Sequence, residues 1–389
     1  MVKYRGGRRV AFPAGAAAVE RLVVAGSGFA GVEAVRVLGL LGVCRPGGGV
    51  ECLWVTPRPV LSFLPYAPAV AGGRLAREEL EWPVERLAEA SGFTIVEKRL
   101  AALRDGVAVL EGGEELEYSG LLVAAGARPA FYGVRGADTE AIPLYSLRDA
   151  ERLRDAASGA ESVAIVGAGF VGVEAAAELL EAARGEGRRL SVTLIDLLPE
   201  PLGLLRNPLA SRVVRRILEE MGAGFVLGEP AAEVRRGGVV LRSGRVVEAD
   251  VVVWSAGFQG PGVEAPAEAL GRGRFLVVDR YLRVRGLRGV YAAGDAAYIE
   301  RGDGCCALKM AREALRSGAA AALNMAEGLR GGRPHPYRPL MTSCVPQAGL
   351  MLGPRRGVMV VGRGVAFESL IPHLYHERIL GEYRRLLAP

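Results

Sequence analysis

The sequence predicts an α/β protein with two parallel sheets, and three observations lead to this fold class. Half of the 389 residues are apolar and 24% are charged, a balance that suits buried cores and argues against disorder. Its 54 glycines fall mostly in turns between apolar runs. One pattern also occurs twice, as RLVVAGSGFAGVEAVRVL at 21–38 and SVAIVGAGFVGVEAAAELL at 162–180. The length suits two domains, or two with a short appendage.

Each copy of the pattern reads as an aliphatic strand, a G-x-G-x-x-G turn and an amphipathic helix. The turn glycines are Gly26, Gly28 and Gly31 in the first copy, and Gly167, Gly169 and Gly172 in the second. In such turns the first glycine permits a tight bend, the second lets a pyrophosphate approach the backbone, and the third lets helix pack on strand. One such motif is weak evidence in a glycine-rich chain. Two copies, each between a strand and a helix, predict two Rossmann-like dinucleotide sites.

The remaining elements follow from apolar periodicity and turn residues. Further strands are predicted at 50–55, 120–124, 190–195, 250–254 and 289–293, and helices at 76–91, 146–157, 207–222 and 307–328. After Pro334 the composition shifts to Pro, Tyr and Arg, and an amphipathic stretch follows at 367–387. We expect this tail to be an appendage that belongs to neither sheet.

The acidic residue that usually follows such a turn distinguishes the two sites. Asp196 directly follows the strand LSVTLI of the second copy. A carboxylate there bonds the ribose 2′-hydroxyl and repels a 2′-phosphate, so NADH is favoured over NADPH. The first copy has Thr56 at the corresponding place, with Glu51 as an alternative at the start of the preceding strand.

Three further segments, LVAAGARP (122–129), VVVWSAG (251–257) and GVYAAGDAA (289–297), make a family resemblance specific. With the two turns, they make residues 20 to 340 resemble the two-dinucleotide flavoproteins, which include type II NADH dehydrogenases, sulfide:quinone reductases and disulfide reductases. The resemblance implies non-covalent FAD at the first turn and NADH at the second. It also implies an NADH domain (129–258) inserted into an FAD domain (18–128 and 259–333), followed by a C-terminal interface or membrane-associating segment (334–389).

The resemblance also assigns cofactor contacts. The expected FAD contacts are Gly26, Gly28, Gly31, Thr56, Ala125, Gly126, Arg128, Gly294 and Asp295, and the expected NADH contacts are Gly167, Gly169, Gly172, Asp196 and Gly257. Ala125 stands where the family usually has threonine. Asp295 would bond the ribityl and pyrophosphate region of FAD.

Within the family, segments 60–87 and 192–205 are most similar to those of type II NADH dehydrogenases. This implies an FAD-dependent oxidoreductase that accepts a hydride from NADH and passes two electrons to a quinone. Glu174 would reach toward the nicotinamide, although an acid that only stabilises the helix dipole fits as well. Lys309, near the N-terminus of helix 307–328, would stabilise the negative charge of reduced FAD, with a solvated surface lysine as the alternative. Arg312 and Arg316 stand where the family has glutamines near the quinone.

The five cysteines lack C-x-x-C and metal-ligand spacing, so we expect mostly reduced thiols in an intracellular chain and no metal site. The C-x-x-x-x-C pair of disulfide reductases is absent. A sulfide:quinone reductase-like protein using Cys344 with Cys305 or Cys306 is the alternative enzyme. A non-catalytic flavoprotein binding module is the alternative from another class.

Charge and hydropathy limit the remaining partners. The formal charge of +6 comes without a basic block interleaved with aromatics, so nucleic acid is not an expected partner. Scarce Lys, Asn and Gln favour a thermophile, although a GC-rich genome explains the preference for Arg equally well. Arg8 and Arg9 lie in a stretch that only weakly resembles an export signal. The predicted helix 367–387 either lies on the inner face of the cell membrane, packs on the body, or forms a homodimer interface.

Overall fold

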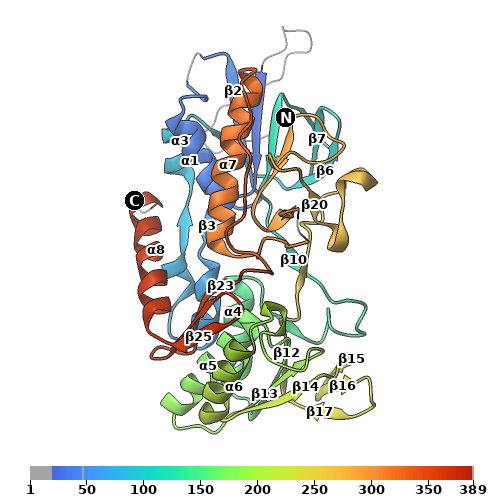
Figure 1. Cartoon of the computed structure of the whole chain (residues 1–389), viewed down its shortest axis with the longest axis vertical. Coiled ribbons are helices and arrows are strands. Elements are labelled where there is room, and N and C mark those ends of the chain that lie inside the picture. The colour runs from blue at the N-terminus through green and yellow to red at the C-terminus, as the bar shows by residue number, and fades with distance from the viewer. Residues whose placement is uncertain (1–19, 46–47, 303, 388–389) are drawn as a thin grey trace.

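The computed structural model describes residues 20–45, 48–302 and 304–387, and it contains two five-stranded parallel sheets stacked along the long axis of the molecule (Figure 1). The first sheet has the order β21 (Val290–Ala292), β9 (Gly120–Val123), β1 (Glu20–Ala25), β2 (Val50–Val55) and β5 (Thr94–Val96). The second has the order β11 (Ile142–Pro143), β18 (Val251–Trp254), β12 (Ser162–Val166), β13 (Ser191–Asp196) and β14 (Ala223–Leu227). The α/β class with two Rossmann-like sheets is therefore confirmed.

The order of the strands records the path of the chain. It leaves the first sheet after β9, builds the whole second sheet between residues 142 and 254, and returns to add β21 beside β9. At the two crossings, β10 (Arg128–Pro129) pairs antiparallel with β19 (Phe258–Gln259). The central strands β1 and β12 end in buried aliphatic residues, as expected for parallel strands covered on both faces.

Helices cover both sheets. They are α1 (Phe29–Leu40), α2 (Ala67–Ala71), α3 (Glu85–Ala90), α4 (Leu147–Ala157), α5 (Phe170–Gly185), α6 (Pro208–Met221), α7 (Ala311–Leu329) and α8 (Ile371–Leu387). In the first unit α7 packs directly on α1, and a Cβ on Gly318 would lie 2.4 Å from the carbonyl oxygen of Ala30. Glycine at this position thus permits the close contact between the two helices.

Short sheets, all antiparallel except one pair, complete the two units and the C-terminal tail. Three are three-stranded: β6 (Leu100–Arg104) with β7 (Val107–Leu110) and β8 (Glu115–Glu117), β15 (Ala231–Arg235) with β16 (Gly238–Leu241) and β17 (Val246–Glu248), and β23 (Gln347–Met351) with β24 (Gly357–Val361) and β25 (Val365–Glu368). Two are pairs: β3 (Val60–Ser62) with β4 (Glu81–Pro83), which is antiparallel, and β20 (Leu276–Val277) with β22 (Ala297–Tyr298), which is parallel. The tail thus forms its own sheet, apart from the two parallel ones.

Aromatic packing fixes α8 against the first unit. Tyr383 lies edge-on to Phe29, with the ring centroids 5.4 Å apart, and Phe63 packs against both rings. The opposite face of α8 leaves Leu374 70% exposed. Within the described ranges, no helix has the length and apolarity needed to cross a bilayer.

Three predicted helices differ from the structure. Instead of a helix at 76–91, a short 3₁₀ turn leads to β4 and then α3, because Trp82 pairs with Leu61 and Pro83 favours extended backbone before it. The helix predicted at 307–328 begins at Ala311, since residues 307 and 308 pair with 341 and 342. The stretch 367–387 begins in β25, and its helix starts at Ile371. The helices predicted at 146–157 and 207–222 are confirmed as α4 and α6, and Arg8 and Arg9 lie outside the described residues.

Candidate active site

In the first glycine turn, neighbouring backbone leaves no room for a side chain at two of the three glycines. Gly26 follows β1 with φ of 112°, and a Cβ there would lie 2.3 Å from the carbonyl oxygen of Ala124. A Cβ on Gly31 would lie 1.9 Å from the carbonyl oxygen of Gly26. Gly28 differs, because its φ is −75° and no described atom lies within 4 Å of its Cβ position. The protein itself would accept a side chain at Gly28, so the open space there fits a bound group.

The second glycine turn repeats this geometry. Gly167 has φ of 110°, and its Cβ would lie 2.6 Å from the backbone nitrogen of Ala256. A Cβ on Gly172 would lie 1.9 Å from the carbonyl oxygen of Gly167. At Gly169 φ is −79°, and the described part of the chain again leaves 4 Å free around the Cβ position. In both turns the second glycine is the first residue before a helix, whose free N–H groups and positive dipole favour a pyrophosphate.

Each glycine turn packs against a segment where the chain crosses from one unit to the other. Gly26 packs against Ala124, which is followed by the predicted site residues Ala125 and Gly126, and Arg128 begins β10. Ala125 is exposed beyond the carboxyl end of β9, and Gly126 has φ of 68°. Gly167 packs in the same way against Ser255 and Ala256, just before the predicted site residue Gly257. The crossings therefore bring both sites to the junction of the two units.

The residues after the second strand of each unit take different roles. Asp196 ends β13, and its two carboxylate oxygens accept hydrogen bonds from the backbone N–H groups of Ala168 (2.7 Å) and Leu198 (2.8 Å). Its charge is thereby fixed beside the second turn. Thr56 is buried, and its hydroxyl donates to the carbonyl oxygen of Arg58 and contacts the hydroxyl of Ser27 at 2.9 Å. Thr56 thus connects the first turn to the segment after β2, and its contact with FAD stays a prediction.

A charged pair lies at the carboxyl end of β21. Gly294, with φ of 62°, donates its N–H to the hydroxyl of Ser317 on α7, which anchors Asp295. Lys309 donates to the carbonyl oxygens of Asp295 (3.1 Å) and Ala297, and its ammonium lies 4.5 Å from the ring centroid of Phe275. Burial lowers the pKa of Lys309 to about 8 and raises the pKa of Asp295, although each charge partly offsets the shift of the other. Lys309 is thus held against the segment that carries Asp295 and is not a freely solvated lysine, while its role toward FAD stays a prediction.

Glu174 faces the C-terminal sheet. It is the fifth residue of α5 and so lies beyond the first turn, where an acid would stabilise the helix dipole, and it accepts the N–H of Met351 at 2.8 Å. Burial raises its pKa to about 8, and the nearby Glu178 adds to the shift. At neutral pH the carboxyl group is therefore mainly protonated. The described contact joins the second unit to the tail, and a nicotinamide contact stays a prediction.

An ion pair that sequence analysis missed joins the two units beside Glu174. Glu178, 3% exposed, binds Arg74 through Oε1–Nη2 (2.5 Å) and Oε2–Nε (3.2 Å). The Arg74 guanidinium lies 5.8 Å from the ring centroid of Tyr66, whose hydroxyl donates to Glu377 of α8 at 2.7 Å. This chain of contacts links α5 and α8 through the residues on either side of α2.

Tyr145 is a second residue between the two units that sequence analysis did not identify. It follows β11 in the second unit, yet burial and the nearby charge of Asp295 in the first unit raise its pKa. Its ring centroid lies 6.3 Å from that of Phe258 in β19. Neither Tyr145 nor Arg74 lies in a recognisable sequence motif. Since their contacts span more than a hundred residues of sequence, local patterns could not reveal them.

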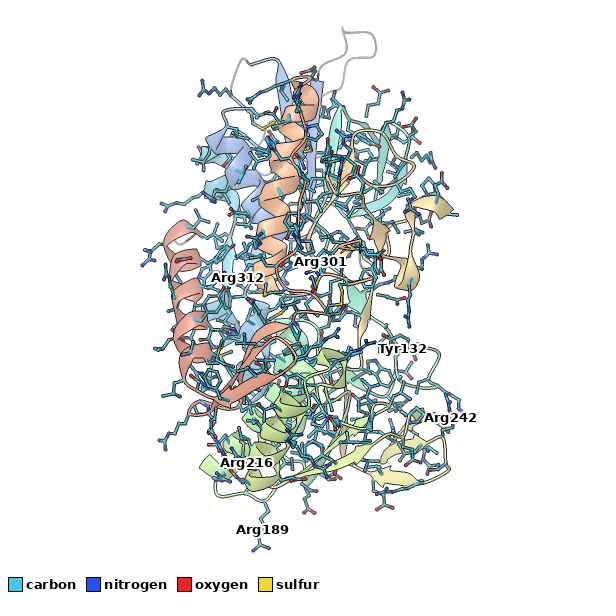
Figure 2. All side chains as sticks on the ribbon, in the orientation of Figure 1. Tyr132, Arg189, Arg216, Arg242, Arg301 and Arg312 are labelled. Carbon is cyan, nitrogen blue, oxygen red and sulfur yellow. A yellow bond between two sulfur atoms is a disulfide. The ribbon has the colours of Figure 1, made fainter. Side chains whose placement is uncertain are left out.

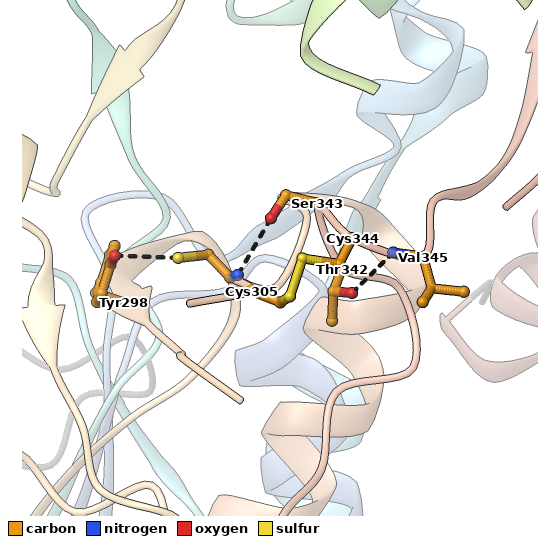
Figure 3. Close-up of a disulfide and its surroundings, with 7 residues drawn as sticks. Tyr298, Cys305, Thr342, Ser343, Cys344 and Val345 are labelled. Carbon is orange, nitrogen blue, oxygen red and sulfur yellow. Dashed lines mark hydrogen bonds between the residues drawn. A yellow bond between two sulfur atoms is a disulfide. The ribbon is translucent and has the colours of Figure 1, made fainter. Parts of the chain in front are cut away.

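The cysteines correct the expectation of mostly reduced thiols. Cys44 is bonded to Cys52, and Cys305 to Cys344, whereas Cys306 is a free thiol. Of the expected pairings to Cys344, the structure contains the one with Cys305 (Figure 3). The thiol of Cys306 donates to the hydroxyl of Tyr298 at 3.0 Å. Among the described residues there is no group of three or more side chains arranged to hold a metal.

Comparison with known proteins places this geometry among dinucleotide-dependent flavoproteins. The family model described as pyridine nucleotide-disulphide oxidoreductase matches residues 20–323. A NADH dehydrogenase-like protein of Mycobacterium tuberculosis is 33% identical over 313 residues, which cover 73% of this chain and 74% of the relative. The rubredoxin-NAD(+) reductase of Pseudomonas putida is 31% identical over 291 residues, 71% of each chain.

Solved structures share the fold at low sequence identity. The sulfide:quinone oxidoreductase of Aquifex aeolicus aligns with a TM-score of 0.78 and 16% identity, and the alignment covers 93% of this chain and 90% of that one. NDH2 of Plasmodium falciparum in complex with NADH aligns with a TM-score of 0.76 and 13% identity, over 96% and 95% of the two chains. These likenesses concern the fold.

Proposed function

The chain belongs to the pyridine nucleotide-disulphide oxidoreductase family, and from this premise we propose that it is an NADH dehydrogenase that passes two electrons to a quinone. The family consists of oxidoreductases that use FAD together with NAD(P)H. Membership therefore makes the chain an oxidoreductase enzyme, which argues against the alternative of a non-catalytic binding module. The choice of NADH, of quinone and of each residue's role is the proposal.

FAD, when bound, supplies the hydride acceptor, so the protein has to provide position and electrostatic field. In our proposal Gly28 and the N-terminus of α1 hold the pyrophosphate of FAD, and Asp295 bonds its polar chain. Lys309 provides a positive charge beside this site that weakens above pH 8, where the ammonium loses its proton. Its hydrogen bonds to two carbonyl oxygens fix that charge near Asp295.

The observation that carries the NADH part is the second glycine turn with its fixed acid. Gly169 leaves open space at the N-terminus of α5, as the pyrophosphate of a dinucleotide requires. Asp196 is held next to this turn by two backbone N–H groups, so its carboxylate is in place to bond a ribose 2′-hydroxyl. A 2′-phosphate would meet that negative charge, and NADH is therefore the preferred substrate. The first turn has no such acid.

The acceptor is proposed from the C-terminal unit and from relatives. The alternative NAD(P)H-ubiquinone oxidoreductase C1 of Arabidopsis thaliana is 31% identical over 51% of this chain. Leu370, just before α8, and Ile371 and Leu374 in α8 are more than half exposed. We propose that this face lies on the inner face of the cell membrane, where a quinone would reach the first unit. Arg312 of α7 connects the first unit to α8, because its guanidinium lies 5.9 Å from the ring centroid of Tyr375 in α8 (Figure 2).

Anaerobic rapid mixing tests the proposal. The purified FAD-loaded protein is mixed with NADH while the visible flavin absorbance is followed, and a soluble short-chain quinone is added in a second mixing step. We expect NADH to bleach the band and the quinone to restore it, each at a rate no slower than turnover. If NADH bleaches the band and quinone does not restore it, the proposed NADH dehydrogenase activity stands but quinone is not the electron acceptor. If NADH leaves the band unchanged, the dehydrogenase is rejected too.

A sulfide-oxidising activity is the second candidate, and the Cys305–Cys344 disulfide favours it. Cys305 is buried while Cys344 is partly accessible, so a small nucleophile would reach the disulfide at Cys344. The same mixing experiment with sulfide in place of NADH separates the two candidates. Bleaching by sulfide that is lost in Cys344→Ser would support this candidate, and bleaching by NADH alone would reject it.

A further inference from the structure

Tyr132 combines a strained backbone with an exposed aromatic ring. Its φ is 52°, a left-handed conformation that non-glycine residues rarely adopt, and the described part of the chain has only four other such residues besides glycines. The side chain is 70% exposed, so burial does not compensate for the strain. Residues held in such conformations cluster at ligand sites. Figure 2 places Tyr132 at the level where the two units meet.

The hydroxyl of Tyr132 lies next to Gly257, in the crossing segment against which the second glycine turn packs. A Cβ on Gly257 would lie 2.5 Å from the Tyr132 oxygen, so glycine is required there for this contact. The preceding residue, Ala256, forms the wall against which Gly167 packs. Two hydrogen bonds hold the neighbouring backbone: Ala130 donates to the carbonyl oxygen of Gly257 at 3.0 Å, and Trp254 donates to that of Ala130 at 2.9 Å.

The sheet order indicates which half of a dinucleotide would reach Tyr132. The glycine turn follows β12, and Asp196, which would bond the adenosine ribose, ends β13 on one side of that strand. Tyr132 lies beyond the carboxyl end of β18, the neighbour of β12 on the other side. A dinucleotide with its pyrophosphate on the turn and its adenosine toward β13 extends its nicotinamide half toward β18.

We propose that Tyr132 is a binding residue for the nicotinamide half of the dinucleotide at the second glycine turn. The inference rests on the proposed use of NADH. The left-handed backbone holds the ring in place before the ligand arrives, which reduces the ordering cost of binding. An exposed phenol offers a flat face for the nicotinamide ring and a hydroxyl for its carboxamide.

Binding measurements without turnover test this assignment. The FAD-loaded protein is titrated by calorimetry with NAD⁺ and with ADP-ribose, which lacks only the nicotinamide ring. For Tyr132→Ala we expect the Kd of NAD⁺ to rise about tenfold and the Kd of ADP-ribose to stay within about twofold. Tyr132→Phe, which keeps the ring, should bind NAD⁺ more tightly than Tyr132→Ala does.

Arg274→Gly serves as the matched control, because Arg274 is exposed and also left-handed, with φ of 57°. It should relieve backbone strain without changing either Kd. An unchanged Kd of NAD⁺ in Tyr132→Ala, or an equal loss for NAD⁺ and ADP-ribose, would overturn the assignment. If the wild-type protein binds neither ligand, the proposed use of NADH fails first. Circular dichroism of each variant checks that the fold is retained.

Discussion

Alanine at position 28 should leave the protein folded but weaken its hold on FAD. Gly28 has a backbone conformation that alanine adopts readily, and no described atom lies within 4 Å of the added methyl. The variant without cofactor should therefore match the wild type within about 1 kcal/mol in free energy of unfolding. A pyrophosphate that approaches the backbone meets the methyl instead. Overpacking of about 1 to 3 kcal/mol raises the Kd of FAD about fivefold to 150-fold.

Gly31→Ala is the matched comparison, for which we expect a loss of stability as the main effect. Its methyl would lie 1.9 Å from the carbonyl oxygen of Gly26, so strand and helix must move apart by more than 1 Å to reach ordinary contact. This variant should lose stability by about 3 kcal/mol or more with or without cofactor. Gly169→Ala and Gly172→Ala repeat the comparison for the second dinucleotide.

The assay measures two quantities for each variant. Urea denaturation of the FAD-free protein gives the free energy of unfolding, and fluorescence titration with FAD gives the Kd. The reasoning predicts that Gly28→Ala changes only the Kd and that Gly31→Ala changes the stability. Full retention of FAD by Gly28→Ala, at wild-type stability, would show that the open space above Gly28 is not where the pyrophosphate binds.

Four further predictions concern charged side chains. Between pH 4.5 and 8 the folded chain keeps a proton on Glu174 that the unfolded chain loses, so the free energy of unfolding falls as pH rises. Glu174→Gln should reduce this fall, and urea denaturation at pH 5 and at pH 8 would measure it. Because the pKa of Lys309 is lowered to about 8, the NADH-driven rate should fall above that pH, and Lys309→Arg should keep its rate to higher pH in a pH profile. Arg74→Met leaves a buried carboxylate unpaired and should cost about 3 to 5 kcal/mol in urea denaturation, whereas also replacing Glu178 by Met should recover most of the loss. Asp196→Asn should lower the ratio of kcat/KM for NADH to that for NADPH without changing FAD content, and an unchanged ratio would contradict the role of this acid.

Sequence reasoning succeeded where one short segment determines the geometry. The glycine turns are visible because the steric limits at Gly31 and Gly172 come from the carbonyl oxygens of Gly26 and Gly167, which lie in the same short motif. The order strand, turn, helix follows from the apolar pattern around them. The family's characteristic Gly294–Asp295 pair was found in the same way.

Contacts between distant segments could not be read in this way. The Arg74–Glu178 pair spans 104 residues, and neither residue stands in a recognisable motif. Trp82 lies in a segment with helical periodicity, yet pairing with Leu61 makes it a strand. Cys44 and Cys52 form a disulfide although their spacing matches no familiar pattern. In each case the deciding interaction comes from tertiary packing.

A structure of the FAD-loaded protein soaked with NAD⁺ tests the central claim most directly. The account predicts FAD with its pyrophosphate on Gly28, and the nicotinamide dinucleotide with its pyrophosphate on Gly169 and its adenosine ribose within hydrogen-bond distance of Asp196. Density for a single dinucleotide, or for the nicotinamide dinucleotide at the first turn, would contradict it.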